Sequence, residues 1–195
     1  MKKIDLDDLM NFEDYARQRK DFRRQVMAHK TTRRVPLGTH LSLYFEDRLT
    51  VLYQVQEMMR IEQIFETEAI QEELNAYNSL IPDGQNWKAT CMLEYDDEQE
   101  RHDALVLLKG FEHQIWVQVG NTEKTFGIAD EGLERNYEEK TSAVHFMRFE
   151  LTADAIQGVH SGAPITFGSD HCEYLKQHTL ESATYQSLLR DLVLH

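Results

Sequence analysis

The sequence lacks most features that mark an exported, membrane-spanning or metal-binding protein. It has two cysteines in 195 residues, Cys91 and Cys172, and no CxxC pair. That count excludes a disulfide-rich scaffold, a zinc ribbon and a cysteine-ligated iron–sulfur cluster, which needs about four thiolates. The longest purely apolar run, residues 104–108, is far too short to span a bilayer. Residues 1–5 turn from basic to acidic without an apolar segment behind them, so we expect no export and a reducing cytoplasm.

Recognisable catalytic and cofactor motifs are also missing. The nine histidines include no HExxH, HxH or Glu-x-x-His spacing, which argues against a zinc protease and a ferritin-like di-iron site. There is no P-loop, dinucleotide fingerprint or Ser-His-Asp arrangement. We therefore expect no metal and no cofactor, and we interpret His145, on the apolar face of a strand, as a core residue.

The charge is unevenly distributed along an ordinary globular composition of 41% hydrophobic and 28% charged residues. The net charge is −13, yet residues 17–34 contain eight Arg and Lys side chains against Asp21 alone. An acidic chain with one basic stripe disfavours generic nucleic-acid binding. Two interpretations remain open: the stripe packs on the chain's own acidic surface, or it meets an anionic ligand or acidic partner.

Hydrophobic spacing predicts a single α+β domain over residues 1–195. The helical part covers about residues 1–82, a sheet-rich part about 86–169 and a C-terminal helix about 173–193. The expected sheet is mostly antiparallel and has about five strands. Asn11 is the expected cap of the first helix.

One predicted helix, from about Phe45 to Phe65, carries polar residues on more than one side. Val51, Val55 and Met59 share an apolar arc, whereas Tyr53, Glu57 and Arg60 line up opposite. We call this line with its flanking residues the polar seam, and its candidate binding residues are Arg33, Arg34, Arg48, Tyr53, Gln54, Glu57 and Arg60. Such a seam forms either a structural hydrogen-bond network or a site in which Glu57 moves a proton and an arginine holds an anion.

Asp170 and His171 are secondary candidates near the expected C-terminal helix. Asp170 with Glu173 matches a capping box, so the simple interpretation is a helix cap. The functional alternative is that His171, at a helix N-terminus, acts as a neutral ligand or base.

The seam also carries a family resemblance. Residues 45–62 read FEDRLTVLYQVQEMMRIE, and the motif FExRxTxxYQxQEMxRxE is similar to the signature of an uncharacterised bacterial family, a domain of unknown function. Supporting matches are KTTRRV at 30–35, YNSLIPDG at 77–84, Asp170-His171 and Asp191-Leu192. Asp47, where the family commonly has Asn, and Cys172, where Pro often follows the His, depart from its pattern. The resemblance implies no established activity. It implies that relatives are often encoded near rubrerythrin-like and iron–sulfur proteins.

These observations lead to three hypotheses. The first is a cytoplasmic accessory or interaction protein whose protein partner is a redox protein, with no nucleic acid and no membrane involved. The second is an enzyme or small-anion-binding protein that uses the polar seam. The third is a structural homo-oligomer in which subunit packing buries the seam helix on two sides.

Overall fold

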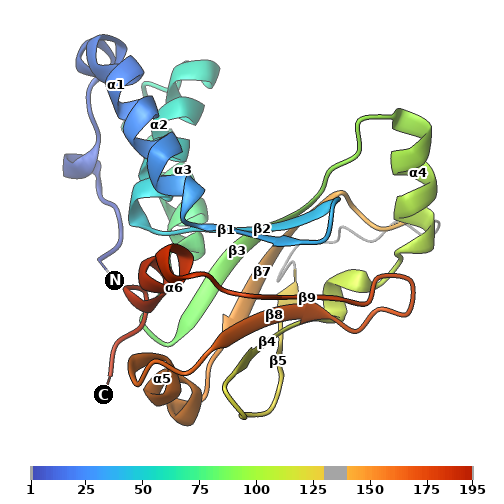
Figure 1. The fold of residues 1–195 in the computed structure, drawn as a ribbon. Helices are drawn as coiled ribbons and strands as arrows, with labels where there is room; N and C mark the ends of the chain where they lie inside the picture. The colour runs from blue at the N-terminus through green and yellow to red at the C-terminus, as the bar shows by residue number, and fades with distance from the viewer. Residues whose placement is uncertain (1, 130–139, 195) are drawn as a thin grey trace.

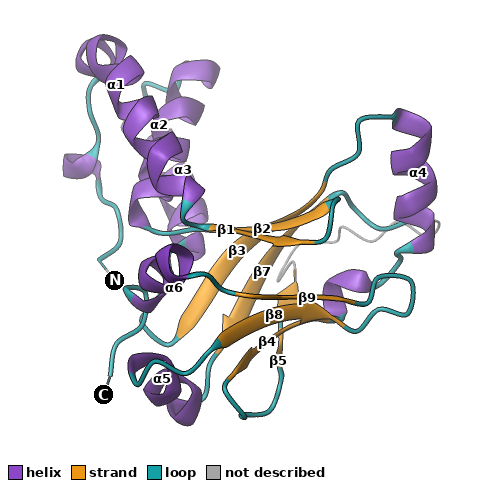
Figure 2. Cartoon of the chain, viewed as in Figure 1, coloured by secondary structure: helices purple, strands orange, loops and turns teal. Residues whose placement is uncertain are grey.

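The computed structural model describes residues 2–129 and 140–194, and it combines helices with two antiparallel sheets (Figures 1 and 2). The predicted α+β class, with helices first, antiparallel strands in the middle and a helix last, is confirmed, and the structure adds a second sheet to the one expected. The α-helices are α1 (Phe12–Thr31), α2 (Arg48–Glu62), α3 (Thr67–Tyr77), α4 (Glu98–Leu107), α5 (Ala153–His160) and α6 (Ser182–Leu189). Single-turn helices are η1 (Leu6–Asp8), η2 (Asn78–Leu80) and η3 (Phe111–His113).

The first sheet has the strand order β1-β2-β3-β7-β6, and the second has the order β5-β4-β8-β9. The strands of the first sheet are β1 (Arg34–Leu37), β2 (Leu41–Phe45), β3 (Asn86–Leu93), β7 (Val144–Glu150) and β6 (Ile128–Ala129). Those of the second are β5 (Thr125–Phe126), β4 (Ile115–Val119), β8 (Ile165–Ser169) and β9 (Lys176–Thr179). All pairings are antiparallel.

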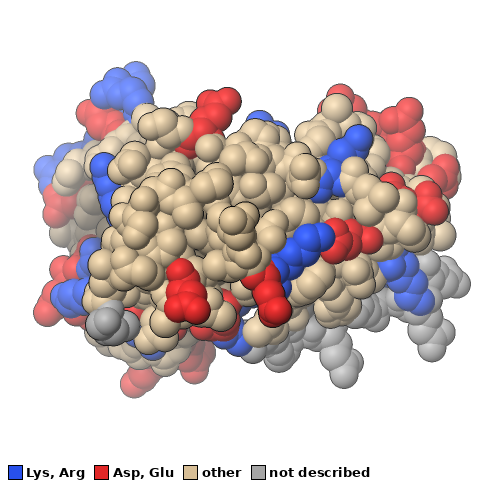
Figure 3. All heavy atoms as spheres, turned by 60° about the horizontal axis from the view of Figure 1, so that its bottom comes forward, with Lys and Arg blue, Asp and Glu red and all other residues tan. Residues whose placement is uncertain are grey.

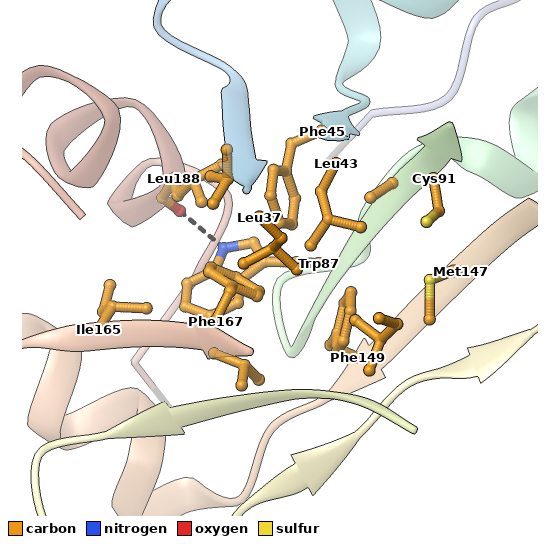
Figure 4. Packing of buried hydrophobic residues seen from close by; sticks show 14 of the residues in the cluster. Leu37, Leu43, Phe45, Trp87, Cys91, Met147, Phe149, Ile165, Phe167 and Leu188 are labelled. Carbon is orange, nitrogen blue, oxygen red and sulfur yellow. Dashed lines mark hydrogen bonds between the residues drawn. The ribbon is translucent and has the colours of Figure 1, made fainter. Parts of the chain in front are cut away.

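The main core lies between the two sheets. Side chains alternate between buried and partly exposed along β3 and β7, as expected for strands with one face against a core. Figure 4 shows Phe45, Trp87, Phe149 and Phe167 gathered there, and these rings pack at tilted or edge-to-face angles. The Trp87 indole N–H donates to the Leu188 carbonyl at 3.0 Å, which attaches α6 to the core.

Residues 125–129 belong to both sheets. Thr125 and Phe126 pair with β4, and after Gly127 the same segment pairs with β7. A Cβ at Gly127 would lie 2.5 Å from the Met147 methyl carbon and 3.0 Å from Phe149 Cε1, so a larger residue here would force these core side chains to move.

The helices α1, α2 and α3 form a separate layer beside the sheets, with α2 in contact with both of the others. Figure 1 shows this layer at one end of the molecule and α4 at the other, with both termini near the helical end. The layer has its own apolar cluster, made of Ile4, Val51, Val55, Met59, Leu74 and Ile81. The Asn11 side chain accepts from the Asp14 amide, so the predicted cap of α1 is confirmed.

Two predicted segments were wrong in detail. The part expected to be helical contains the β1–β2 hairpin at residues 34–45, where Pro36 is tolerated because β1 is an edge strand of its sheet. The C-terminal helix begins at Ser182 rather than near residue 173, because residues 176–179 add the strand β9 to β8. The single domain over 1–195 stays a prediction, and residues 1, 130–139 and 195 lie outside the described part.

Over residues 2–129 and 140–194, none of the helices has the length and apolar character that crossing a membrane requires. Figure 3 shows the underside of the molecule, where the centre of the surface is largely uncharged and the Lys, Arg, Asp and Glu side chains lie mostly towards its margins.

Candidate functional site

The polar seam begins with a well-capped α2. The Asp47 side chain accepts from the Thr50 amide, and the Thr50 hydroxyl receives the Asp47 amide in return, which closes a capping box. The expected apolar arc of Val51, Val55 and Met59 is buried. This helix therefore presents its apolar arc to α3 and the N-terminal segment, and its polar line to α1.

Glu57 is the centre of an ion-pair network between α1 and α2. Arg19 donates to both carboxylate oxygens, from Nε at 2.7 Å and from Nη2 at 2.8 Å. The Tyr15 hydroxyl donates at 2.5 Å and Arg60 at 3.2 Å. Hydrogen bonding by Arg19 is the main reason that the pKa of Glu57 is lowered to about 2, against the smaller opposing effect of burial. The carboxylate is thus ionised and fully engaged near neutral pH.

Tyr53 and Gln54 also have partners within the helical layer. The ring of Tyr53 packs edge-on against Phe22 of α1, with ring centres 5.9 Å apart. Gln54 adjoins Tyr77 of α3, where it partly offsets the burial that raises the pKa of the Tyr77 hydroxyl. The two residues are adjacent in sequence, but they face different neighbouring helices.

Arg48 binds the N-terminal segment. Its guanidinium lies 2.5 Å from the Asp8 carboxylate, and its buried Nε has no hydrogen-bond partner among the described residues. The Asp5 backbone and Arg48 together lower the pKa of Asp8 to about 2. Two side-chain amides also hold this segment: Asn78 bonds the N–H and carbonyl of Ile4, and Gln56 bonds those of Met10. Arg48 is therefore explained by a local ion pair.

Arg33 is the centre of a second, buried network between α1, the first sheet and α6. Its exposed fraction is 2%. Nη2 contacts Asp191 at 2.5 Å and the Glu46 carbonyl at 3.0 Å, and Nη1 contacts the carbonyl and hydroxyl of Ser187 at 3.3 and 3.2 Å. Nε donates to the Phe45 carbonyl at 3.0 Å. All five N–H groups of the guanidinium thus have an acceptor.

Arg34 follows Arg33 in the sequence, but the Arg33 side chain is buried and the Arg34 side chain is exposed. It is exposed on the outer face of β1, where it donates to the Ser42 hydroxyl at 2.9 Å and lies over the Tyr44 ring at 5.6 Å. The candidate residues therefore do not converge: Arg33 faces the core, Arg34 the outer sheet surface, and Arg48 and Glu57 different sides of α2.

Sequence reasoning missed several members of the buried network. The Asp47 carboxylate lies 3.5 Å from Arg33 Nε and 2.5 Å from His29 Nε2, and Glu46 accepts from the hydroxyls of Thr50 and Thr90. Burial raises the pKa of Asp191 to about 6, against the opposing effect of Arg33. The signal was present, because Glu46, Asp47 and Asp191 all fall inside the stretches that carried the family resemblance, but their proximity could not be read from spacing.

Asp170 and His171 follow β8, in the turn that leads to β9. Asp170 accepts from the Trp116 indole at 2.7 Å and from Lys124 at 2.8 Å, and hydrogen bonding by Lys124 lowers its pKa. The His171 ring accepts from the Glu173 amide at Nδ1 (3.3 Å), and its Nε2 lies 3.4 Å from the Lys109 carbonyl. No helix starts here, so the expected Asp170 cap was wrong and Cys172, exposed and free, does not lie at a helix N-terminus.

The described residues contain no group of three or more His, Cys, Asp and Glu side chains that could hold a metal ion. An open hollow at the start of α4 is lined by Asp97, Glu98, Gln99 and His102. These residues belong to the opposite end of the molecule from the polar seam, so the hollow gives the seam no binding cavity (Figure 1).

Comparison with known proteins supports the family resemblance. Residues 3–192 match the model of a family described as "Protein of unknown function (DUF3501)". A solved structure of a protein of unknown function from Burkholderia pseudomallei K96243 is 42% identical, with a TM-score of 0.93 over 98% of this chain and 100% of that one. No curated protein matches the chain. Because the family model covers nearly the whole sequence, this chain belongs to that family of proteins of unknown function.

Proposed function

We propose that this protein is a cytoplasmic accessory protein that acts by binding another protein, and that the polar seam holds its helical layer together. One observation carries the proposal: both carboxylate oxygens of Glu57 already accept hydrogen bonds from side chains of α1 and α2. Arg19 binds both of its oxygens, and Tyr15 and Arg60 add further donors.

A general base needs a pKa near the working pH. Glu57 has a pKa of about 2, so its carboxylate has little affinity for a proton at neutral pH. Arg33 has all five of its N–H groups occupied and is 2% exposed, which leaves no donor for an incoming anion. These two residues therefore have the surroundings of structural groups.

The cytoplasmic assignment rests on the cysteines, which number two in 195 residues and form no CxxC pair. Cys91 is buried and Cys172 is exposed. The partner class follows from the family resemblance, which implies relatives encoded near rubrerythrin-like and iron–sulfur proteins. We therefore propose a redox protein as the partner.

The test measures binding and stability on the same variants. The purified protein is titrated calorimetrically with a purified rubrerythrin-like protein and an iron–sulfur oxidoreductase from the same organism. We expect saturable binding of one of them, unchanged by Glu57→Gln in a protein that is still folded. The absence of binding to either protein would contradict the redox partner.

A second experiment tests the two alternatives, an enzyme and a small-anion-binding protein. Wild type and Glu57→Gln are compared for chemical unfolding and for binding of inorganic phosphate and sulfate. We expect lower stability and no anion binding in either protein. Anion binding by wild type that is lost in a Glu57→Gln variant of unchanged stability would contradict the structural role and favour a site at the seam.

A further inference from the structure

One side of α1 carries a row of basic residues that the fold does not use. Ala16, Lys20, Arg23, Met27 and Lys30 recur at spacings of four, three, four and three, so they share one side of the helix. Within the described part of the chain, the side chains of Lys20, Arg23 and Lys30 make no hydrogen bond or ion pair, unlike Arg17 and Arg24, which pair with acids three residues earlier. We call this set the basic row.

The basic row lies on the side of α1 that adjoins the exposed end of α2. Phe12 and Arg19 lie within about 40° of Arg23 around the helix axis. Phe12 stacks on Phe65 at 4.5 Å, and Arg19 binds Glu57. Near them, Ile61 and Phe65 are 62% and 63% exposed, which makes them two of the most exposed large apolar residues described.

A complementary row lies on α3. Ala69, Glu72, Glu73 and Ala76 occupy one side of that helix, and neither glutamate has an ion pair among the described residues. Glu73 is four residues from Tyr77, and Tyr77 adjoins Gln54 of α2: burial chiefly raises the pKa of Tyr77, Glu73 adds to this rise and Gln54 opposes it. Gln54 and Ile61 are seven residues apart and so share a side of α2. We call this set the acidic row; it adjoins the same exposed line of α2.

The open face of the helical layer therefore runs from the basic row of α1, past Ile61 at the end of α2 and Phe65 just beyond it, to the acidic row of α3. A face with this order is complementary to itself after a rotation of 180° about an axis along α2. We infer that two copies of this chain associate through this face, with the basic row of each against the acidic row of the other and Ile61 and Phe65 between them.

A second copy fits this face better than other anionic partners. It supplies both signs of charge, and the alanines in the two rows let the helix backbones approach. Nucleic acid or an anionic membrane would be repelled by the acidic row and by the overall net charge of −13. The two rows flank the Glu57 network without using its donors or its carboxylate, so the inference does not depend on the proposed redox partner.

Charge reversal gives a sharp test. Sedimentation velocity and light scattering are measured at micromolar concentrations on wild type, on Lys20→Glu/Arg23→Glu and on Glu72→Lys/Glu73→Lys. We expect a wild-type dimer that weakens as salt rises, and a dissociation constant at least about tenfold higher in each double variant. Mixing the two variants should restore a dimer, because each reversed row then meets an opposite charge. Circular dichroism confirms that every variant is folded.

The control is Gln18→Glu/Gln25→Glu, which adds acid to the other side of α1 and should leave the dimer unchanged. A monomeric wild type would overturn the inference, as would reversed variants that dimerise like wild type or a mixture that fails to associate. A wild-type monomer that co-sediments with vesicles of anionic phospholipid would assign the basic row to a lipid surface and would equally overturn it.

Discussion

The molecule contains two networks of the same residue types in different surroundings. Around Arg33 and Asp191, both side chains are 2% exposed, and the network joins the first sheet to α6. Around Glu57, the exposed fractions of the side chains are 15% for the glutamate, 37% for Arg19 and 40% for Arg60, and the network joins two helices at the surface. Water can replace a lost partner in the second network but not in the first. Burial, rather than residue type, therefore sets how much each network contributes to stability.

The two networks also shift ionisation in opposite directions. Asp191 has a pKa raised by burial to about 6, whereas Glu57 has a pKa lowered by Arg19 to about 2. The folded state consequently binds a proton more readily than the unfolded state at Asp191, and less readily at Glu57.

Replacing Arg33 should have the largest effect. Arg33→Leu leaves Asp191 and Asp47 as buried carboxylates without their counter-charge, which we expect to cost about 3–5 kcal/mol of unfolding free energy. Urea unfolding measures it. Arg34→Leu, the exposed neighbour, is the matched control and should change stability by less than about 1 kcal/mol. Similar losses in both variants would refute the distinction between the networks.

The pH dependence of stability tests the buried network next. Because the folded pKa of Asp191 is raised from 3.8 to about 6, its contribution is most favourable at low pH, falls as pH rises from about 4 to 6 and is constant above. Asp191→Asn should remove a fall on the order of 3 kcal/mol over this window. Urea unfolding of variant and wild type at matched pH gives the difference curve. A difference of the opposite sign would show that Arg33 outweighs burial.

Glu57→Gln should be less damaging than Arg33→Leu. It removes the charge that Arg19 and Arg60 share, and we expect a loss of about 1–2 kcal/mol at neutral pH. The lowered pKa of Glu57 stabilises the fold above about pH 4.5, and this contribution disappears as pH falls towards 2. The gap between wild type and variant in urea unfolding should therefore close in acid. A gap that widens in acid would contradict the assignment.

Arg60→Gln should have the smallest effect. Arg60 makes a single contact with Glu57 at 3.2 Å and is exposed, so we expect a loss below about 0.5 kcal/mol. Thermal unfolding in low and in high salt measures it, since salt should erase even this small difference. A loss as large as that of Glu57→Gln would mean that Arg60, rather than Arg19, holds the carboxylate.

Local signals in the sequence predicted most of the helices and central strands. The Asn11 cap and the alternation along residues 144–150 need only neighbouring residues to be recognised. The strand β9 was missed because it is a short, mostly exposed edge strand, whose polar residues 176–179 carry no apolar alternation.

The candidate site was predicted only where its partners are close in sequence. The Glu57–Arg60 pair is visible as a spacing of three. Arg33 and Asp191 are 158 residues apart, and Arg19 and Glu57 are 38 apart, so their contacts depend on the finished packing. Spacing along a helix identifies the side on which a residue lies, but not the side chain that meets it there.

The segment 125–129 has a consequence for how the protein opens. Its first residues complete the edge of one sheet on β4, and its last residues complete the edge of the other on β7. Fraying that frees residues 125–126 from β4 therefore pulls on residues 128–129, which pair with β7 at the edge of the other sheet. Amide protons in the two sheets should therefore become exchangeable with solvent together, as one cooperative unit, rather than sheet by sheet.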